Sequence, residues 1–339
     1  MPPLLKVDHL RVWFPKETTF FGTPRTWIKA VDDVCFQLQP GQTLGLVGES
    51  GSGKSTTALA TLRALRPRQG SIQFCPDGSR VHELATMSQK ELRPLRRHMQ
   101  MIFQDPFSSL SPRMNILQII AEPMKVSGTT TRAQRKERVK QLLQEVGLSP
   151  LFLQRYPHAF SGGQRQRIVI ARALALNPSL IVCDEPVSAL DVSVQAQILN
   201  LMMKLKEQYD LSYLFIAHDL EVVRHIADTV AVMYAGQLVE HGPREKVFNT
   251  PLHPYTRALL ASAPKPDTRA RRQRPILHGE VPDPSALPGG CVFHPRCPEA
   301  MDICSETIPA QTRTDQRTVR CLLYENAPKV QPEGAVTGE

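Results

Sequence analysis

The chain has 339 residues and a formal net charge of +9 at pH 7, from 41 lysines and arginines against 32 aspartates and glutamates. This length predicts about two domains, and 41% hydrophobic with 22% charged residues excludes a largely disordered chain. No stretch reaches the ~18 uncharged apolar residues of a membrane helix, and the N-terminus has no signal-peptide pattern, so we expect a cytosolic protein. The positive charge is compatible with nucleic acid, an anionic membrane surface or a phosphorylated ligand, and also with a plain basic surface.

Strand-like and helical patterns alternate over most of the chain. The segments expected as strands, rich in β-branched and aliphatic residues, are 4–7, 31–38, 43–48, 70–74, 180–183, 213–217, 229–234 and 236–240. The segments expected as helices, from the spacing of their apolar residues, are 55–65, most of 90–153, 164–176 and 192–209. This alternation predicts an α/β core with a largely parallel sheet.

The composition changes after about residue 254. Residues 265–290 are rich in proline, glycine and arginine, which predicts a linker. Residues 291–326 carry four of the seven cysteines, and residues 327–339 are expected to form a flexible tail. The sequence therefore predicts a large unit over 1–264 followed by a small cysteine-bearing appendage.

A glycine-rich loop between the strand at 43–48 and the helix at 55–65 matches the phosphate-binding pattern G-x-x-x-x-G-K-[ST]. The matching residues are Gly48, Glu49, Ser50, Gly51, Ser52, Gly53, Lys54 and Ser55, with Thr56 next on the helix. Glycines let backbone amides point at a phosphate, and the helix N-terminus adds partial positive charge. We expect Lys54 to bridge the β- and γ-phosphates and the Ser55 hydroxyl to bind Mg²⁺.

Two carboxylates follow the buried strand at 180–183. Asp184 is placed to hold Mg²⁺ through water, and Glu185 is placed to act as the general base that polarises the attacking water. Such a pair is weak evidence alone, but it becomes strong downstream of a phosphate loop.

A second anion-binding helix end is expected where the helix at 164–176 begins. Its residues are Ser161, Gly162, Gly163 and Gln164. Because the chain already has a phosphate loop, a second such end suggests a nucleotide shared between two subunits. The alternative is a plain helix N-cap.

In this order, the phosphate loop, the Phe160–Gln164 signature and the Asp184–Glu185 pair resemble the ATP-binding subunit of an ABC transporter, over about residues 4–264. The resemblance implies an α/β P-loop NTPase core, an N-terminal antiparallel β subdomain and a helical signature subdomain at about 105–170. It also implies that residues 1–264 form the ATP-binding domain and that the chain is an ATPase.

Lesser motifs of that family are present as well. Gln104 matches the Q-loop glutamine, which would bind Mg²⁺ together with Ser55 and Asp184 and couple to membrane subunits. Asp191 ends the D-loop motif, and His218 matches the switch histidine that contacts the γ-phosphate. Alone, a glutamine or histidine is more often an ordinary surface or core residue.

Phe14 occupies the place of the aromatic residue that stacks on adenine in this family. The alternative is that Trp13 or Tyr234 packs there instead.

The resemblance implies a head-to-tail dimer with a second ABC ATP-binding subunit, identical or different, which ATP joins and hydrolysis releases. Further implied partners are two transmembrane permease subunits and an extracytoplasmic substrate-binding protein, with this chain peripheral on the cytoplasmic face of the membrane. No nucleic acid is expected. A soluble ABC ATPase acting on nucleic acid or the ribosome is the alternative, but such proteins usually carry two cassettes or long coiled-coil insertions.

The four C-terminal cysteines, Cys291, Cys297, Cys304 and Cys321, lack the tight pairs of structural zinc sites. A [4Fe–4S] cluster on a loop without a helix or strand scaffold, zinc, and free thiols all remain open from this spacing. The remaining cysteines are expected to be small buried hydrophobic residues; they are Cys35, Cys75 and Cys183.

The segments His253–Thr256 and Leu287–Pro298 resemble the C-terminal extension of the dipeptide/oligopeptide/nickel branch of these importers. That resemblance implies an iron–sulfur site at the four cysteines, with a structural or regulatory role. It also favours a peptide as cargo, with dipeptide, oligopeptide, glutathione, an antimicrobial peptide and nickel all open.

Overall fold

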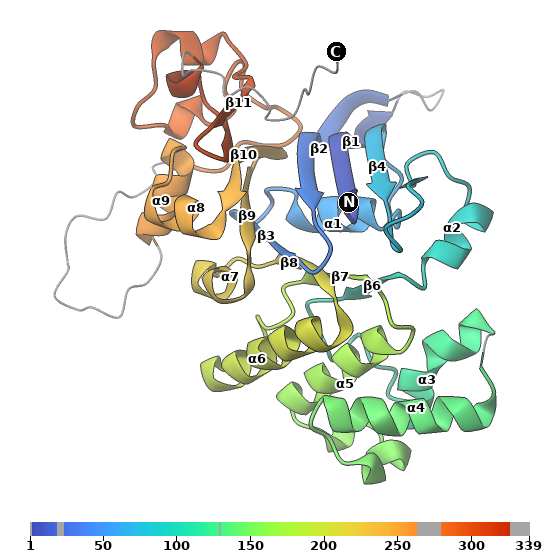
Figure 1. The fold of residues 1–339 in the computed structure, drawn as a ribbon. Helices are drawn as coiled ribbons and strands as arrows, with labels where there is room; N and C mark the ends of the chain where they lie inside the picture. The colour runs from blue at the N-terminus through green and yellow to red at the C-terminus, as the bar shows by residue number, and fades with distance from the viewer. Residues whose placement is uncertain (1, 19–23, 129, 263–278, 326–339) are drawn as a thin grey trace, which may run out of the picture.

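A computed structural model describes residues 2–18, 24–128, 130–262 and 279–325 of the chain. Its centre is an eight-stranded sheet in the order β11-β12-β10-β9-β3-β8-β7-β6 (Figure 1). These strands are β3 (Thr43–Val47), β6 (Met99–Ile102), β7 (Leu180–Asp184), β8 (Ser212–Ile216), β9 (Thr229–Tyr234), β10 (Gln237–Pro243), β11 (Gln311–Thr314) and β12 (Arg317–Arg320). Strands β6, β7, β8, β3 and β9 are parallel to one another, whereas β10, β12 and β11 continue the sheet antiparallel from β9. The expected parallel α/β sheet is confirmed for this central part.

An antiparallel sheet formed by the N-terminal residues covers one side of the molecule, in the order β2-β1-β4-β5. Its strands are β1 (Leu5–Thr18), β2 (Pro24–Leu38), β4 (Gln69–Phe74) and β5 (His82–Glu83). Strands β1 and β2 are longer than expected, because irregularities in their pairing carry them past polar residues. His9 and Asp33 have positive φ angles of 50° and 66° beside these irregularities.

Helices flank both sheets and form a separate lobe (Figure 1). They are α1 (Lys54–Thr61), α2 (Gln89–Leu95), α3 (Ile116–Ser127), α4 (Arg132–Glu145), α5 (Gly162–Leu174), α6 (Val192–Tyr209), α7 (Leu220–Ile226), α8 (Arg244–Asn249) and α9 (Pro254–Ser262). The expectation of a mostly helical 90–153 is wrong at residues 99–102, because these form β6 and pair in parallel with β7. Helices α3, α4 and α5 pack together as the helical lobe. Within the described ranges, every helix is too short or too polar to cross a bilayer.

Alternating side chains of the central strands feed two hydrophobic cores. On β7, Leu180 and Val182 face the core shared with α1 and the N-terminal sheet, whereas Ile181 and Cys183 face the core shared with the helical lobe. A strand that is buried on both faces has a continuous run of apolar residues, and this pattern at residues 180–183 predicted β7. The phosphate loop begins at the end of β3, a strand whose residues also contribute to both hydrophobic cores.

The cysteine-bearing region is built onto the ATP-binding part of the chain. The expectation that it lacks a strand scaffold is wrong, since β12 pairs with β10 and extends the central sheet. Cys291, Phe293 and Cys304 belong to the same hydrophobic core as Tyr234. Of the expected linker, residues 279–290 form turns and irregular backbone, while 265–278 lie outside the described residues, as does the expected tail at 327–339.

Candidate nucleotide site

The phosphate loop has the strand–loop–helix context that the sequence predicted. It leaves β3 at Val47 and enters α1 at Lys54. Gly48 and Gly53 have φ angles of 154° and 101°, and an added Cβ would lie 2.1 Å from the carbonyl oxygen of Met233 and 2.2 Å from that of Ala30, respectively. The loop thus threads between the backbones of β9 and β2, where a side chain has no room.

Lys54 lies inside this loop and is buried. Its Nζ donates to the carbonyl oxygens of Gly48 at 2.9 Å and Glu49 at 2.8 Å. Burial lowers the pKa of Lys54, and the carboxylates of Glu185, Asp184 and Glu49 oppose that shift. The ammonium is therefore already directed into the loop where a phosphate would bind.

The other residues of the expected loop surround it. Ser52 is buried, and its carbonyl accepts from Gly236 N at 2.9 Å. Ser50 and Gly51 are exposed at the tip, and Thr56 is half-buried on α1. Backbone amides at the tip are thus accessible to a ligand.

Ser55 and Asp184 form the oxygen-rich floor of the site. The Ser55 hydroxyl donates to Asp184 Oδ1 at 3.0 Å, which joins the start of α1 to the end of β7. Burial raises the pKa of Asp184, although the hydrogen bond from Ser55 opposes this shift. A hydroxyl beside a carboxylate is a ligand set that suits Mg²⁺.

The Glu185 carboxylate is contacted by two side chains that follow different strands. Its Oε2 accepts from Gln104 Nε2 at 3.0 Å and lies 3.0 Å from His218 Nδ1. Gln104 follows β6, Glu185 follows β7 and His218 follows β8, so the carboxyl ends of three parallel strands supply this group. Glu185 also has a φ of 48°, a conformation that costs energy for a residue with a side chain and is common at functional sites.

The helix end at 161–164 is a capping box in this structure. Ser161 Oγ accepts from Gln164 N at 3.4 Å, and Gln164 Oε1 accepts from Ser161 N at 3.1 Å. An added Cβ at Gly163 would lie 2.5 Å from Val194 Cγ1, so α5 packs closely on α6. Asp191 in turn caps α6, accepting from Val194 N at 2.9 Å.

Residues 161–164 lie away from the phosphate loop of the same chain. Helix α5 belongs to the helical lobe, whereas α1 lies beneath the N-terminal sheet (Figure 1). Within the described part of the chain, these four residues make no hydrogen bond or ion pair with residues 48–55.

Phe14 lies on β1 opposite Ile28 and packs against the core shared with α1. Tyr234 is fully buried, with Tyr255 and Phe293 at centroid distances of 4.7 Å and 5.2 Å, so it has no face free for adenine. The ring of Trp13 lies 5.1 Å from Lys29 Nζ.

Comparison with known proteins places this geometry in a family. A model described as "ABC transporter" matches residues 31–188, and one described as "Oligopeptide/dipeptide transporter, C-terminal region" matches residues 239–304. The oligopeptide transport ATP-binding protein AppF of Bacillus subtilis is 49% identical over 325 residues, 95% of this chain and 97% of that protein. The chain belongs to the ABC transporter family.

A second relative and two solved structures lead to the same family. A probable peptide ABC transporter ATP-binding protein of Sinorhizobium fredii is 52% identical over 94% of this chain and 89% of its own length. Among solved structures, a dimeric post-hydrolysis state of the cassette MJ0796 bound to ADP and Pi has a TM-score of 0.61 at 26% identity, covering 71% of this chain and 98% of that one. CbiO1 of Clostridium perfringens, part of an ABC transporter complex, has the same TM-score at 25% identity, covering 74% of this chain and 92% of that one. The chain is an ABC ATPase, the ATP-hydrolysing subunit of a transporter of the oligopeptide/dipeptide family.

The first three cysteines of this ABC ATPase's C-terminal region lie on a tightly turned segment. Cys291 N donates to the carbonyl oxygen of Cys304 at 2.8 Å, and Met301 N donates to Cys304 Sγ at 3.5 Å. An added Cβ at Gly290 would lie 2.4 Å from the carbonyl oxygen of Cys304, so only glycine permits this approach. Cys321 comes from the end of β12 to join them.

The other three thiols lie close enough to Cys321 to affect its ionisation. Burial and the charges of Cys291, Cys297 and Cys304 together raise the pKa of Cys321 to about 11. However, no three of the four Sγ atoms lie within 4.8 Å of one another.

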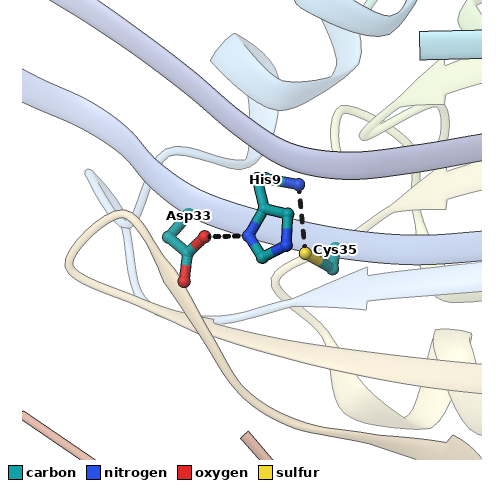
Figure 2. Close-up of side chains that lie close together, drawn as sticks. All are labelled: His9, Asp33 and Cys35. Atoms are coloured by element: carbon teal, nitrogen blue, oxygen red, sulfur yellow. Dashed lines mark hydrogen bonds and ion pairs between the residues drawn. The ribbon is translucent and has the colours of Figure 1, made fainter. Parts of the chain in front are cut away.

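A different cluster, His9, Asp33 and Cys35, is the one set of at least three ligand-type residues in the described ranges whose donor atoms lie within 4.8 Å (Figure 2). Asp33 Oδ1 lies 2.6 Å from His9 Nδ1, and Asp33 Oδ2 accepts from Arg320 Nη2 at 2.5 Å. Although burial opposes it, these two hydrogen bonds hold the pKa of Asp33 below its usual value. Since Arg320 already balances the carboxylate, we interpret the cluster as an ion-pair network.

The expectation for the other cysteines holds in part. Cys75 and Cys183 are buried, as expected. Cys35 is only half-buried, and its Sγ accepts from His9 N at 3.1 Å, so it is not a simple hydrophobic residue.

Two residues outside the expected site hold Glu49 of the phosphate loop. Tyr255 accepts from Glu49 N at 2.9 Å, and Arg296 forms an ion pair with the Glu49 carboxylate. Both lie in the C-terminal motifs that indicated the importer branch, but no spacing rule joins them to a loop more than 200 positions away along the sequence.

Proposed function

We propose that this chain is the motor subunit of a peptide importer of the dipeptide or oligopeptide type, peripheral on the cytoplasmic face of the membrane. The observation that carries the proposal is the convergence of Gln104 and His218 on Glu185, beside the Ser55–Asp184 pair. The match of residues 239–304 to the oligopeptide/dipeptide C-terminal region supports a peptide as cargo.

In the proposed mechanism the chain's own residues first bind ATP. Lys54 and the loop amides contact the phosphates, and Phe14 contacts the adenine. Ser55, Asp184 and Gln104 would hold Mg²⁺, which offsets phosphate charge when bound. For Lys54 this requires its hydrogen bonds to the Gly48 and Glu49 carbonyls to be exchanged for phosphate oxygens.

Hydrolysis then depends on Glu185 as general base. Its Oε2 is held by Gln104 and His218, which fixes the direction in which the carboxylate accepts a proton from water. The positive φ of Glu185 turns the chain sharply after β7 and keeps the side chain at the strand ends. His218, with a side chain that is 60% exposed, is accessible to a γ-phosphate.

The site is completed by a second ABC subunit, identical or different. The helix end from Ser161 to Gln164 would contact the partner's nucleotide, and Asp191 would lie at the same interface. Support comes from the exposure of Ser161 and from Val192, which is 81% exposed beside Asp191. The similar cassette MJ0796 is a dimer in its post-hydrolysis structure.

A groove of about 1090 Å³ beside Gln104 is the surface that we assign to the permease subunits. It lies between α2, β6 and the helical lobe, and its lining includes Phe103, Met124 and Val126. Phe103 is 45% exposed and Val126 67%, so the groove presents apolar side chains to solvent. Because Phe103 adjoins Gln104, a shift in this groove would reach the hydrolytic site directly.

The experiment that tests the motor proposal is reconstitution with the candidate permeases and binding protein in lipid vesicles. Peptide together with binding protein is expected to raise ATP hydrolysis, and labelled peptide is expected to accumulate only with ATP. Stimulation by nucleic acid or ribosomes, without any response to permeases, would contradict the proposal.

We further propose the domain division 1–264 for the ATP-binding domain with a helical subdomain at about 105–170, 265–290 for the linker, 291–326 for the four-cysteine appendage and 327–339 for the tail. In this appendage, Cys291, Cys297, Cys304 and Cys321 would hold a [4Fe–4S] cluster that stabilises the fold. Anaerobic purification is expected to yield four iron and four sulfide per chain. A Cys304→Ser variant is expected to lose this iron, and stoichiometric zinc instead would contradict the cluster.

A further inference from the structure

Glu49, the second residue of the phosphate loop, is held by the C-terminal region on both its backbone and its side chain. Arg296 Nη1 donates to Oε2 at 2.8 Å and Arg296 Nη2 donates to Oε1 at 3.1 Å, which makes the ion pair bidentate. The Glu49 N–H donates to the Tyr255 hydroxyl at 2.9 Å. Bidentate arginine–carboxylate pairs fix geometry as well as charge.

The position of Arg296 is set by close packing around it. Its side chain is 6% exposed, and its backbone N–H donates to the carbonyl oxygen of Phe293 at 3.0 Å. Phe293 is 1% exposed and packs edge-on against Tyr234 and Tyr255, at centroid distances of 5.2 Å and 5.4 Å. Arg296 Nη1 also donates to the Tyr234 hydroxyl at 3.3 Å. The packing of Phe293, Tyr234 and Tyr255 thus holds the Arg296 guanidinium beside Glu49.

The charge of Glu49 reaches the phosphate-binding ammonium. Among the groups that counter the effect of burial on the pKa of Lys54 are the carboxylates of Glu185, Asp184 and Glu49. A carboxylate in a loop that binds a triphosphate repels its ligand unless a cation balances it. Arg296 supplies that cation from a segment far along the sequence.

We propose that Arg296 is a positioning residue for ATP, which neutralises Glu49 and anchors the loop, so that the C-terminal region completes the phosphate site. The proposal rests on ATP binding by this cassette and does not depend on the cargo or on what the cysteines hold. It predicts that Arg296 acts on ATP affinity through Glu49, and not merely on the attachment of the C-terminal region.

Arg320 provides a matched control. Like Arg296, it directly precedes a cysteine of the C-terminal region, has a side chain that is 6% exposed, and forms an ion pair with a carboxylate of the ATP-binding part. Its partner is Asp33 on β2, which is not part of the phosphate loop. The two arginines therefore share the attachment role, and only Arg296 contacts the loop.

The experiment compares full-length wild type with Arg296→Gln, Glu49→Gln, the double variant and Arg320→Gln. Mg·ATP affinity is measured with a fluorescent ATP analogue, and steady-state kcat, KM and Tm are measured in parallel. Loss of a charge-assisted contact at this position is expected to raise the Kd and KM of Arg296→Gln on the order of tenfold, with kcat within about twofold. Because Glu49→Gln removes the unbalanced carboxylate, the double variant is expected to return to within about threefold of wild type.

Arg320→Gln is expected to lower Tm while leaving the Kd for ATP unchanged. Wild-type affinity in Arg296→Gln, no recovery in the double variant, or equal loss of affinity in Arg320→Gln would each overturn the proposal. If Arg296→Gln does not fold, Arg296→Lys is used instead, because lysine keeps the charge but loses the bidentate contact. The Kd of Arg296→Lys for ATP is expected to rise by a smaller factor, and adding Glu49→Gln is expected to abolish that rise. A Kd of Arg296→Lys equal to that of the wild type would also overturn the proposal. The affinity for ATP is measured without permease subunits. A failure of peptide-stimulated hydrolysis would therefore contradict the proposed function and would not affect this test of Arg296.

Discussion

We expect the replacement of Glu185 with glutamine to separate ATP binding from hydrolysis. Glutamine keeps the shape of the side chain and one acceptor oxygen, so contacts from Gln104 and His218, both at 3.0 Å in the wild type, remain available. What is lost is the capacity to accept a proton from water. The positive φ of 48° is as accessible to glutamine as to glutamate, so we expect the turn after β7 to persist.

The size of the effect follows from the role of the carboxylate. General-base catalysis contributes about 10²–10⁴-fold, or roughly 3–5 kcal/mol of barrier, so kcat is expected to fall by at least about a hundredfold. Binding is expected to be kept or tightened, because the charge of Glu185 acts on both Asp184 and Lys54. Weakening two charge-assisted hydrogen bonds costs about 1 kcal/mol each, which predicts only a small loss of stability.

The assay measures kcat, the Kd for Mg·ATP and ATP-dependent dimer formation by size-exclusion chromatography. Glu185→Gln is expected to accumulate as an ATP-bound dimer that the wild type forms only transiently. Glu221→Gln makes the same chemical change on an exposed side chain of α7 and is expected to behave like wild type. A kcat within fivefold of wild type in Glu185→Gln, with ATP binding intact, would refute the assignment of the base.

Three further predictions follow from single residues. Lys54→Ala is expected to weaken ATP binding and hydrolysis together, since it removes the ammonium held in the loop; equal affinity for wild type and variant would contradict this. Gly163→Ala is expected to reduce ATP-driven dimer formation and cost about 1–3 kcal/mol in urea unfolding, because its Cβ meets Val194 at 2.5 Å, and Val194→Ala should restore both. His253 is fully buried, and burial lowers its pKa to about 3. On acidification this histidine therefore takes up a proton in the unfolded chain before it does so in the folded chain. The free energy of unfolding should fall below pH 6.5 by up to roughly 1.4 kcal/mol per pH unit until about pH 3. His253→Asn, which can still accept from Tyr255 N, is expected to flatten that slope, and an unchanged slope would exclude His253 as its source.

The positions of the expected site residues at the strand ends could be predicted because these residues lie in short motifs that directly end or follow apolar strands. Asp184 ends β7, and Gln104, Glu185 and His218 each follow a strand that pairs in parallel, so their positions at the strand ends bring them together once the sheet forms. The lengths of β1 and β2 could not be predicted, because pairing irregularities at polar residues such as His9 carry no hydrophobic pattern. Strand β6 was missed for a related reason, since its four residues are defined by pairing with β7 and not by their own periodicity.

By itself, the sequence determined the fold class, the strand–loop–helix that matches the phosphate-binding pattern and the residues expected to act on ATP, since each depends on local spacing and residue type. Only the tertiary structure decided that the C-terminal region extends the central sheet of the ATP-binding part, because β12 pairs with β10 across a long stretch of chain. It also decided that Arg296 meets Glu49, an ion pair between segments 247 positions apart. Contacts of this kind come from packing, here of Phe293 against Tyr234 and Tyr255, which no local pattern in the sequence records.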